Sequence, residues 1–188
     1  MRKLSMLVCL CTLLTFAVHA QTYTAGTNTI SLGVGLGSSI ANGYTYGSQT
    51  PGLSFHYDRG IWEVGPGVIS LGAYVGYKEY KYSFNDGLGD NISEKWNYTI
   101  FGVRGAYHFT GLHVDNLDLY AGAMLSYNHL SYSYSDGQGG NSPGGSYGSD
   151  LGLTGFVGAQ YFFAGNLAAF AELGYGVSII DVGLSYKF

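Results

Sequence analysis

The sequence has few cysteines, few prolines and few charged side chains. Its two cysteines, Cys9 and Cys11, both lie close to the start, and there are only 3 prolines among 188 residues. No disulfide, thiolate metal site or thiol nucleophile is therefore expected in the rest of the chain. Charged residues make up 11% of the sequence and aromatic residues 16%, and there are 31 glycines. Disordered chains combine few aromatics with high charge, so this glycine content favours close backbone approach in a tightly curved sheet.

Long apolar runs are also absent beyond the first residues, and a membrane-spanning helix needs about 20 apolar residues. The start itself has the pattern of an export signal: Arg2 and Lys3 are followed by an apolar stretch over 4–18 and a small-residue cleavage site at Val18-His19-Ala20. We predict a signal peptide over 1–20, a short N-terminal segment over 21–28 and one domain over 29–188. Loss of the two cations makes a chain of formal charge −4 more negative, which argues against nucleic acid as a partner.

Apolar residues alternate with small or polar ones along most of the chain. In 30–37 every even position is branched and apolar, and every odd position is Gly or Ser. Alternation of period two predicts a strand with one apolar face and one small, polar face. The same contrast recurs in seven further segments, so we predict eight strands: 30–37, 53–58, 69–78, 101–109, 117–128, 151–163, 167–174 and 180–188.

Four of these predicted strands end on two aromatic residues spaced one apart. Residues i and i+2 share a face of a strand, so each pair places two rings together at one strand end. A soluble protein gains little from exposed rings, whereas Tyr and Phe at the headgroup level anchor the apolar band of a membrane barrel. We therefore predict an all-β fold, an eight-stranded antiparallel up-and-down transmembrane β-barrel. Its periplasmic aromatic girdle is predicted to contain Phe55, Tyr57, Tyr107, Phe109, Tyr161, Phe163, Tyr186 and Phe188.

The connections between the predicted strands alternate in length, as in outer-membrane barrels with short periplasmic turns and longer outer loops. The outward parity switches from odd to even across the last connection, which fits a two-residue turn. Both termini are then periplasmic. The predicted periplasmic turns are 58–67, 110–116 and 164–166, the outer loops are 41–50, 83–94 and 135–149, and the last outer turn lies within 174–177.

Charged residues are sparse on the predicted inner face. The interior of an eight-stranded barrel is only wide enough for side chains to fill it, so general diffusion through it is not expected. Buried charges must be paired, and we predict ion pairs of Arg104 with Asp118 and of Glu172 with Lys187. A structural plug is favoured over a proton or ion path.

The chain resembles the small eight-stranded outer-membrane barrels of the OmpX and OmpA transmembrane-domain type. The resemblance lies in the signal peptide, the outward apolar alternation, the inward Gly, Ser and scattered charges, and the terminal Tyr186-Lys187-Phe188. It implies a multi-pass barrel in the outer membrane of a Gram-negative-type bacterium, in contact with outer-membrane lipid and lipopolysaccharide. The terminal Phe188 resembles the signal read by the barrel-insertion machinery. No peptidoglycan-binding domain follows the predicted barrel, so no cell-wall tether is expected.

Members of this group range from structural proteins to adhesins and enzymes, so the fold does not fix the function. The favoured hypothesis is a structural or surface-interaction role carried by the outer loops, alone or as a subunit of a larger membrane assembly. No enzymatic activity or cofactor is expected. No metal is expected either, because the carboxylates within 85–94 lack the spacing of a calcium loop. A narrow-pore transporter of small or hydrophobic solutes is one alternative.

A second alternative, a lipid A-modifying enzyme, rests on His129-Leu130-Ser131. His129 and Ser131 share the lipid-side face of a predicted strand near the outer rim. The pattern is similar to the His-x-Ser of outer-membrane lipid A deacylases, in which the histidine activates a serine that is a weak nucleophile on its own. The chain departs from that family at Tyr132, where the family has Asn. An ordinary His and Ser at the rim is the favoured interpretation.

Overall fold

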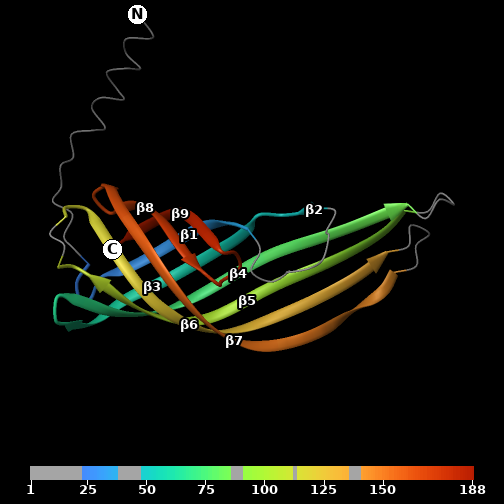
Figure 1. Cartoon of the computed structure of the whole chain (residues 1–188), viewed down its shortest axis with the longest axis horizontal. Helices are drawn as coiled ribbons and strands as arrows, with labels where there is room; N and C mark the ends of the chain where they lie inside the picture. The colour runs from blue at the N-terminus through green and yellow to red at the C-terminus, as the bar shows by residue number, and fades with distance from the viewer. Residues whose placement is uncertain (1–22, 38–47, 86–90, 112–113, 136–140) are drawn as a thin grey trace, which may run out of the picture.

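The computed structural model describes residues 23–37, 48–85, 91–111, 114–135 and 141–188, which form one antiparallel sheet closed into a barrel (Figure 1). A further strand of two residues, β2 (Ser48–Gln49), pairs with β4 beyond the point where β3 begins. The described residues contain no helix that is long and apolar enough to cross a membrane. The barrel strands are β1 (Asn28–Leu36), β3 (Gly52–Val64), β4 (Gly67–Asn85), β5 (Asn91–Phe109), β6 (Leu117–Ser135), β7 (Asn141–Ala164), β8 (Leu167–Gly174) and β9 (Ile180–Lys187).

The barrel closes through the pairing of its first and last strands. With the short β2 left aside, every other pairing joins barrel strands that follow each other in the chain. Strand β1 pairs antiparallel with β9, with Ile30 opposite Tyr186. At the end of this seam the backbone N–H of Phe188 donates to the carbonyl of Asn28 at 2.9 Å, and the N–H of Asn28 donates to the carbonyl of Phe188 at 3.2 Å. The predicted eight-stranded up-and-down barrel is thereby confirmed.

The two faces of the barrel wall have opposite chemistry. Outward apolar side chains are widely exposed, with Leu153 79% and Val103 67% accessible. Inward polar side chains are buried and bonded to one another, as where the Ser31 and Ser185 hydroxyls lie 2.7 Å apart across the β1–β9 seam. A soluble barrel has the reverse arrangement. An apolar exterior around a polar interior is the arrangement of a barrel that spans the outer membrane, and it confirms the predicted inward and outward faces.

The connection between β8 and β9 folds into the barrel. Its residue Val177 is fully buried, packs in a cluster that includes Tyr74 and Phe156, and donates its backbone N–H to the Tyr74 hydroxyl at 3.0 Å. The predicted two-residue turn was wrong, because residues 175–179 separate the two strands. The switch of parity is confirmed, since Leu173 and Ile180 are paired and both exposed.

Strand β3 continues through most of the predicted turn at 58–67. The pairing of β3 with β4 shifts register between Gly60 and Trp62. The extra residue of such a bulge reverses which face the following side chains occupy, so the period-two pattern is broken although the strand continues. The turn itself contains only Gly65 and Pro66, and Gly65 has a φ of 57°, in the left-handed region that favours glycine.

Strands β4 to β7 are much longer than predicted, and Figure 1 shows them extending beyond β1, β8 and β9. They contain 19, 19, 19 and 24 residues, against 9, 8 and 8 in the three short strands. The predicted loops at 83–94 and 135–149 were therefore too long. Where a hairpin leaves the membrane both faces meet water, so the apolar alternation that marks a strand ends before the strand does. The predicted signal peptide and most of the predicted loop at 41–50 lie outside the described residues.

Gly72 on β4 tests how closely the wall is packed. A Cβ at this position meets the carbonyl oxygen of Tyr57 and the carboxylate of Asp58, both on β3. We expect Gly72→Ala to lower the free energy of unfolding by about 1–3 kcal/mol, because a methyl group overfills the site. Gly105→Ala is the matched control, since its Cβ approaches no atom closer than 3.5 Å. Urea unfolding in detergent measures both, and equal losses would contradict the packing argument.

Candidate functional site

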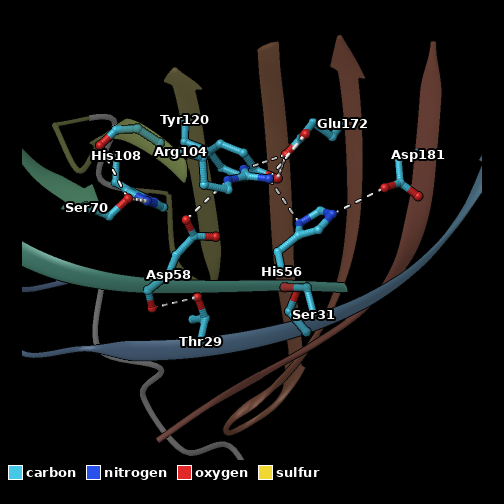
Figure 2. Close-up of polar contacts among 12 residues, drawn as sticks. Thr29, Ser31, His56, Asp58, Ser70, Arg104, His108, Tyr120, Glu172 and Asp181 are labelled. Atoms are coloured by element: carbon cyan, nitrogen blue, oxygen red, sulfur yellow. Dashed lines mark hydrogen bonds and ion pairs between the residues drawn. The ribbon is translucent and has the colours of Figure 1, made fainter. Parts of the chain in front are cut away.

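A single buried arginine forms the centre of the barrel interior. Arg104 projects inward from β5 and is 2% exposed. Its Nη2 donates to Glu172 Oε2 on β8 at 2.7 Å, and its Nε lies 3.2 Å from Asp58 Oδ1 on β3. The second contact is an ion pair without a hydrogen bond. The Tyr120 hydroxyl also donates to Glu172 Oε2, at 3.1 Å (Figure 2). Strands that are not neighbours are thus tied together across the interior.

His56 extends this network toward β9. Arg104 Nη1 lies 3.2 Å from His56 Nδ1, and His56 Nε2 lies 3.3 Å from Asp181 Oδ2 (Figure 2). A guanidinium has donors only, so Nδ1 accepts and the proton is on Nε2, which donates to Asp181. Asp181 Oδ2 also accepts a hydrogen bond from the Ser54 hydroxyl. The network therefore fixes one tautomer of His56.

A second polar cluster contains a serine, a histidine and an aspartate on three adjacent strands. Ser70 Oγ lies 3.0 Å from His108 Nε2, and His108 Nδ1 lies 2.8 Å from Asp118 Oδ2. This order of contacts is that of a serine nucleophile with its base and orienting acid. Ser70 has no exposed surface, however, and the adjacent backbone groups are paired in the strand ladder. A reacting substrate has neither access nor an oxyanion hole here, so the cluster ties strands β4, β5 and β6 together.

The predicted ion-pair partners were wrong, although all four residues face the interior. Arg104 and Glu172 pair with each other, Asp118 pairs with His108, and the Lys187 ammonium lies 4.5 Å from the centre of the Phe162 ring. The register explains the difference. Arg104 is opposite Met124, six residues along β6 from Asp118, a distance of about 20 Å at the usual rise per strand residue. Glu172 is opposite Asp181, again six residues from Lys187.

Three of the four predicted aromatic pairs end their strands. Tyr107 and Phe109 close β5, the pair at 161–163 stops one residue before the end of β7, and the pair at 186–188 spans the end of β9. The first pair, Phe55 and Tyr57, lies inside β3 instead, because β3 continues to Val64. Tyr57 is nevertheless close to the C-terminal pair, since it is opposite Ile30 on β1, which is opposite Tyr186 on β9.

His129 and Ser131 lie on β6, where the strand extends beyond the short barrel strands. Both side chains are partly exposed, and the pairing with β7 shifts register between them, with His129 opposite Ser149 and Ser131 opposite Ser146. Within the described part of the chain, no hydrogen bond joins His129 to Ser131, and no ion pair joins His129 to a carboxylate. The pair does not form the activated serine that a deacylase needs.

The projecting ends of β4 to β7 form the other candidate site. Strand β7 pairs with β8 only from Phe156 onward, where it lies opposite Gly174. Among the described residues, no strand pairs with 141–155 of β7 on the side away from β6. An unpaired edge presents a row of N–H and C=O groups that another chain can pair with. Sequence reasoning missed this edge because it placed most of the segment in a loop.

No protein-family model and no curated protein matches the chain. Among solved structures, it is similar to the crystal structure of Ail, the attachment invasion locus protein of Yersinia pestis, in complex with the heparin analogue sucrose octasulfate. The identity is 15%, the match covers 88% of this chain and 100% of that chain, and the TM-score is 0.49. The crystal structure of Ail matches at 16% identity with the same coverage and a TM-score of 0.45. The backbone structure of Yersinia pestis Ail in a phospholipid bilayer nanodisc matches at 17% identity, covering 87% and 99%, with a TM-score of 0.43.

Replacement of Arg104 by alanine tests the interior network. The change leaves Asp58 and Glu172 without their cation, and breaking a buried ion pair costs about 3–5 kcal/mol. We expect Arg104→Ala to lower the temperature at which the folded band disappears on gels of heated samples. Lys81→Ala is the control, because Lys81 pairs with Glu79 at 3.0 Å but is largely exposed, and such pairs contribute at most about 1 kcal/mol. Unchanged heat resistance of Arg104→Ala would show that the network is not needed for stability.

Proposed function

We propose that the chain is an outer-membrane barrel that acts in surface interactions through the projecting sheet of β4, β5, β6 and β7. The observation that carries the proposal is the difference in strand length. About 9–11 residues cross the membrane in a tilted strand, and β1, β8 and β9 are close to this length whereas β4 to β7 are roughly twice as long. The excess forms ordered backbone outside the lipid, at the end opposite to the short turns. In this proposal the end of the barrel with the short turns faces the periplasm, and the start of β1 and the end of β9 lie at this same end.

The open edge of β7 favours one mode of interaction, the addition of a strand from a partner protein. In this mode main-chain hydrogen bonds supply the affinity and alternate side chains supply the specificity. The unpaired edge of β7 begins where β8 ends. A partner strand bound to this edge would lie beside β7 in line with β8. The opposite border of the projecting sheet is less open, because β2 pairs with β4 at Ser48 and Gln49.

The alternative functions receive less support from the site. A narrow-pore transporter needs a path through the barrel, and the described interior is filled by the Arg104 network and by the cluster around Tyr74, Tyr120 and Phe156. A lipid A-modifying enzyme needs an activated serine, and Ser131 is not bonded to His129. Insertion through a machinery that reads Phe188, and contact of the girdle with lipid and lipopolysaccharide, belong to the proposal as well.

Photo-crosslinking in intact cells tests the interaction surface. A photoreactive residue in place of Asp150, which is exposed on the open edge of β7, is expected to give a discrete protein adduct. The same residue in place of the outward Leu184 on β9 is the control, because it faces lipid and should give none. Adducts from both positions, or from neither, would contradict the proposed role of the edge.

A trimmed barrel provides a second control for this experiment. Replacement of 132–145 by Asn-Gly joins Ser131 to Ser146, which are cross-strand partners, so the register below them is kept. The trimmed barrel should keep the gel mobility of a folded barrel and lose most of the adduct from position 150. An adduct of unchanged yield would show that the projection is not what the partner binds.

The enzyme alternative has its own test. We expect lipid A from cells that express the wild-type chain to carry the same acyl groups as lipid A from cells that express Ser131→Ala or no barrel at all. Mass spectrometry of extracted lipid A measures the acylation. A species lacking one acyl chain that appears with the wild type and disappears with Ser131→Ala would establish the enzyme.

A further inference from the structure

The short-turn end of the barrel holds a buried aromatic side chain that belongs to no strand. Tyr23 precedes β1 and is 1% exposed. Its ring stacks on the imidazole of His108, with the ring centroids 3.7 Å apart and the planes 1° from parallel. His108 is the middle member of the Ser70–His108–Asp118 cluster, and its ring also lies 5.3 Å from that of Tyr120. The N-terminal segment thus places a ring directly over the polar interior.

A single turn over residues 24–27 positions this ring. The N–H of Thr27 donates to the carbonyl of Thr24 at 3.1 Å, and Gly26 between them has a φ of 91°. A β-turn with a positive φ at its third residue requires glycine there. The N–H of Gly26 donates to the Gly60 carbonyl, and the N–H of Gly60 donates to the Thr27 carbonyl, both at 2.9 Å. The turn is therefore anchored to β3, and the ladder of β1 begins only afterwards, at Asn28.

The barrel wall leaves space for the ring. A Cβ on Gly60 would lie 2.4 Å from the Thr24 carbonyl oxygen and 3.2 Å from Tyr23 Cε1, so glycine at this position makes room for the turn and for the ring. The buried Tyr23 hydroxyl makes no hydrogen bond within the described residues. The ring is therefore held by stacking and packing, and its hydroxyl is not held by a hydrogen bond.

We propose that Tyr23 is a latch that closes the short-turn end of the barrel, and that the space it fills is a slot for one planar aromatic ring. Stacking on His108 provides the attraction, and the turn at 24–27 provides the tether. Among the described residues, the turn is the part of the backbone that ties Tyr23 to the barrel, and it lies outside the strand ladder, so the latch opens without breaking that ladder. When it opens, the Ser70–His108–Asp118 cluster gains contact with solvent and the slot is free for another planar ring, such as a phenol or an aromatic side chain of a partner.

A thiol reporter at Ser70 tests the latch. In a chain with Cys9→Ser and Cys11→Ser, Ser70→Cys introduces the one reactive thiol, because the sequence contains no further cysteine. A small methanethiosulfonate reagent is applied to the barrel in detergent, and labelling is quantified only in the folded band of an unheated gel. We expect slow labelling with Tyr23 present and labelling faster by on the order of tenfold or more in Tyr23→Ala, because the covering ring is gone. Equal rates would overturn the latch.

Two further variants separate closure by Tyr23 from general loosening of the barrel. Gly26→Ala strains the turn through φ alone, because its Cβ meets no atom within 4 Å, and Gly65→Ala does the same in the β3–β4 turn. We expect Gly26→Ala to accelerate labelling at position 70 and Gly65→Ala to leave it unchanged. Acceleration by both would mean that the reporter detects lost stability and not an open latch.

Chemical rescue tests the slot. Addition of p-cresol to Tyr23→Ala should restore protection at position 70 in a saturable manner, because a planar ring can stack on His108. Cyclohexanol is the matched control, since it has a similar size and a hydroxyl but no flat face. Protection by both compounds, or by neither, would overturn the slot. These outcomes do not depend on the projecting sheet, so they are separate from any failure of the proposed function.

Discussion

The structure depends on one constraint, which is that every backbone N–H and C=O group of a strand within lipid must be bonded inside the protein. The chain meets this constraint by pairing β1 with β9, which removes both edges within the membrane. In a closed barrel one face of every strand meets lipid and the other face meets the interior. Each strand must therefore present apolar residues outward at every second position. It also limits the volume inside, and Gly33 faces the interior where a Cβ would collide with Asp181 and Ser54.

A narrow, closed interior explains why one arginine holds such a central place. Four buried carboxylates, those of Asp58, Asp118, Glu172 and Asp181, share the interior with Arg104 and two buried histidines. A guanidinium has five donors in a rigid fork, so Arg104 can contact β3 and β8 together. Its Cζ lies 4.1 Å from the centre of the Phe156 ring. A lysine ammonium in the same place would lack this planar fork. The network connects strands that the backbone ladder leaves unconnected.

The sequence predicts this fold well where one face of a strand meets lipid and poorly elsewhere. The segment 167–174 was predicted with the bounds that β8 has, because its alternation continues from end to end. The bulge at Ile61 broke that pattern and hid the second half of β3. The ion-pair partners could not be predicted, because alternation gives the face of a residue but not the cross-strand register. Arg104 and Glu172 were correctly placed inside, but their pairing follows from a register that no local motif encodes.

The two ends of the barrel differ because β8 and β9 are short. Their connection folds inward at Val177 and does not continue the hairpin, so β7 extends beyond them, and no described strand pairs with 141–155 on that side. The buried Val177 also fills the interior from this end, where it joins Tyr74 and Phe156. At the other end, turns of two residues at 65–66 and 165–166 join neighbouring strands without a projection. Here the Tyr23 ring stacks on His108 in the polar interior. The inward fold of one five-residue connection therefore both fills the interior at this end and leaves 141–155 of β7 without a described strand on one side, which is the edge that the proposed function uses.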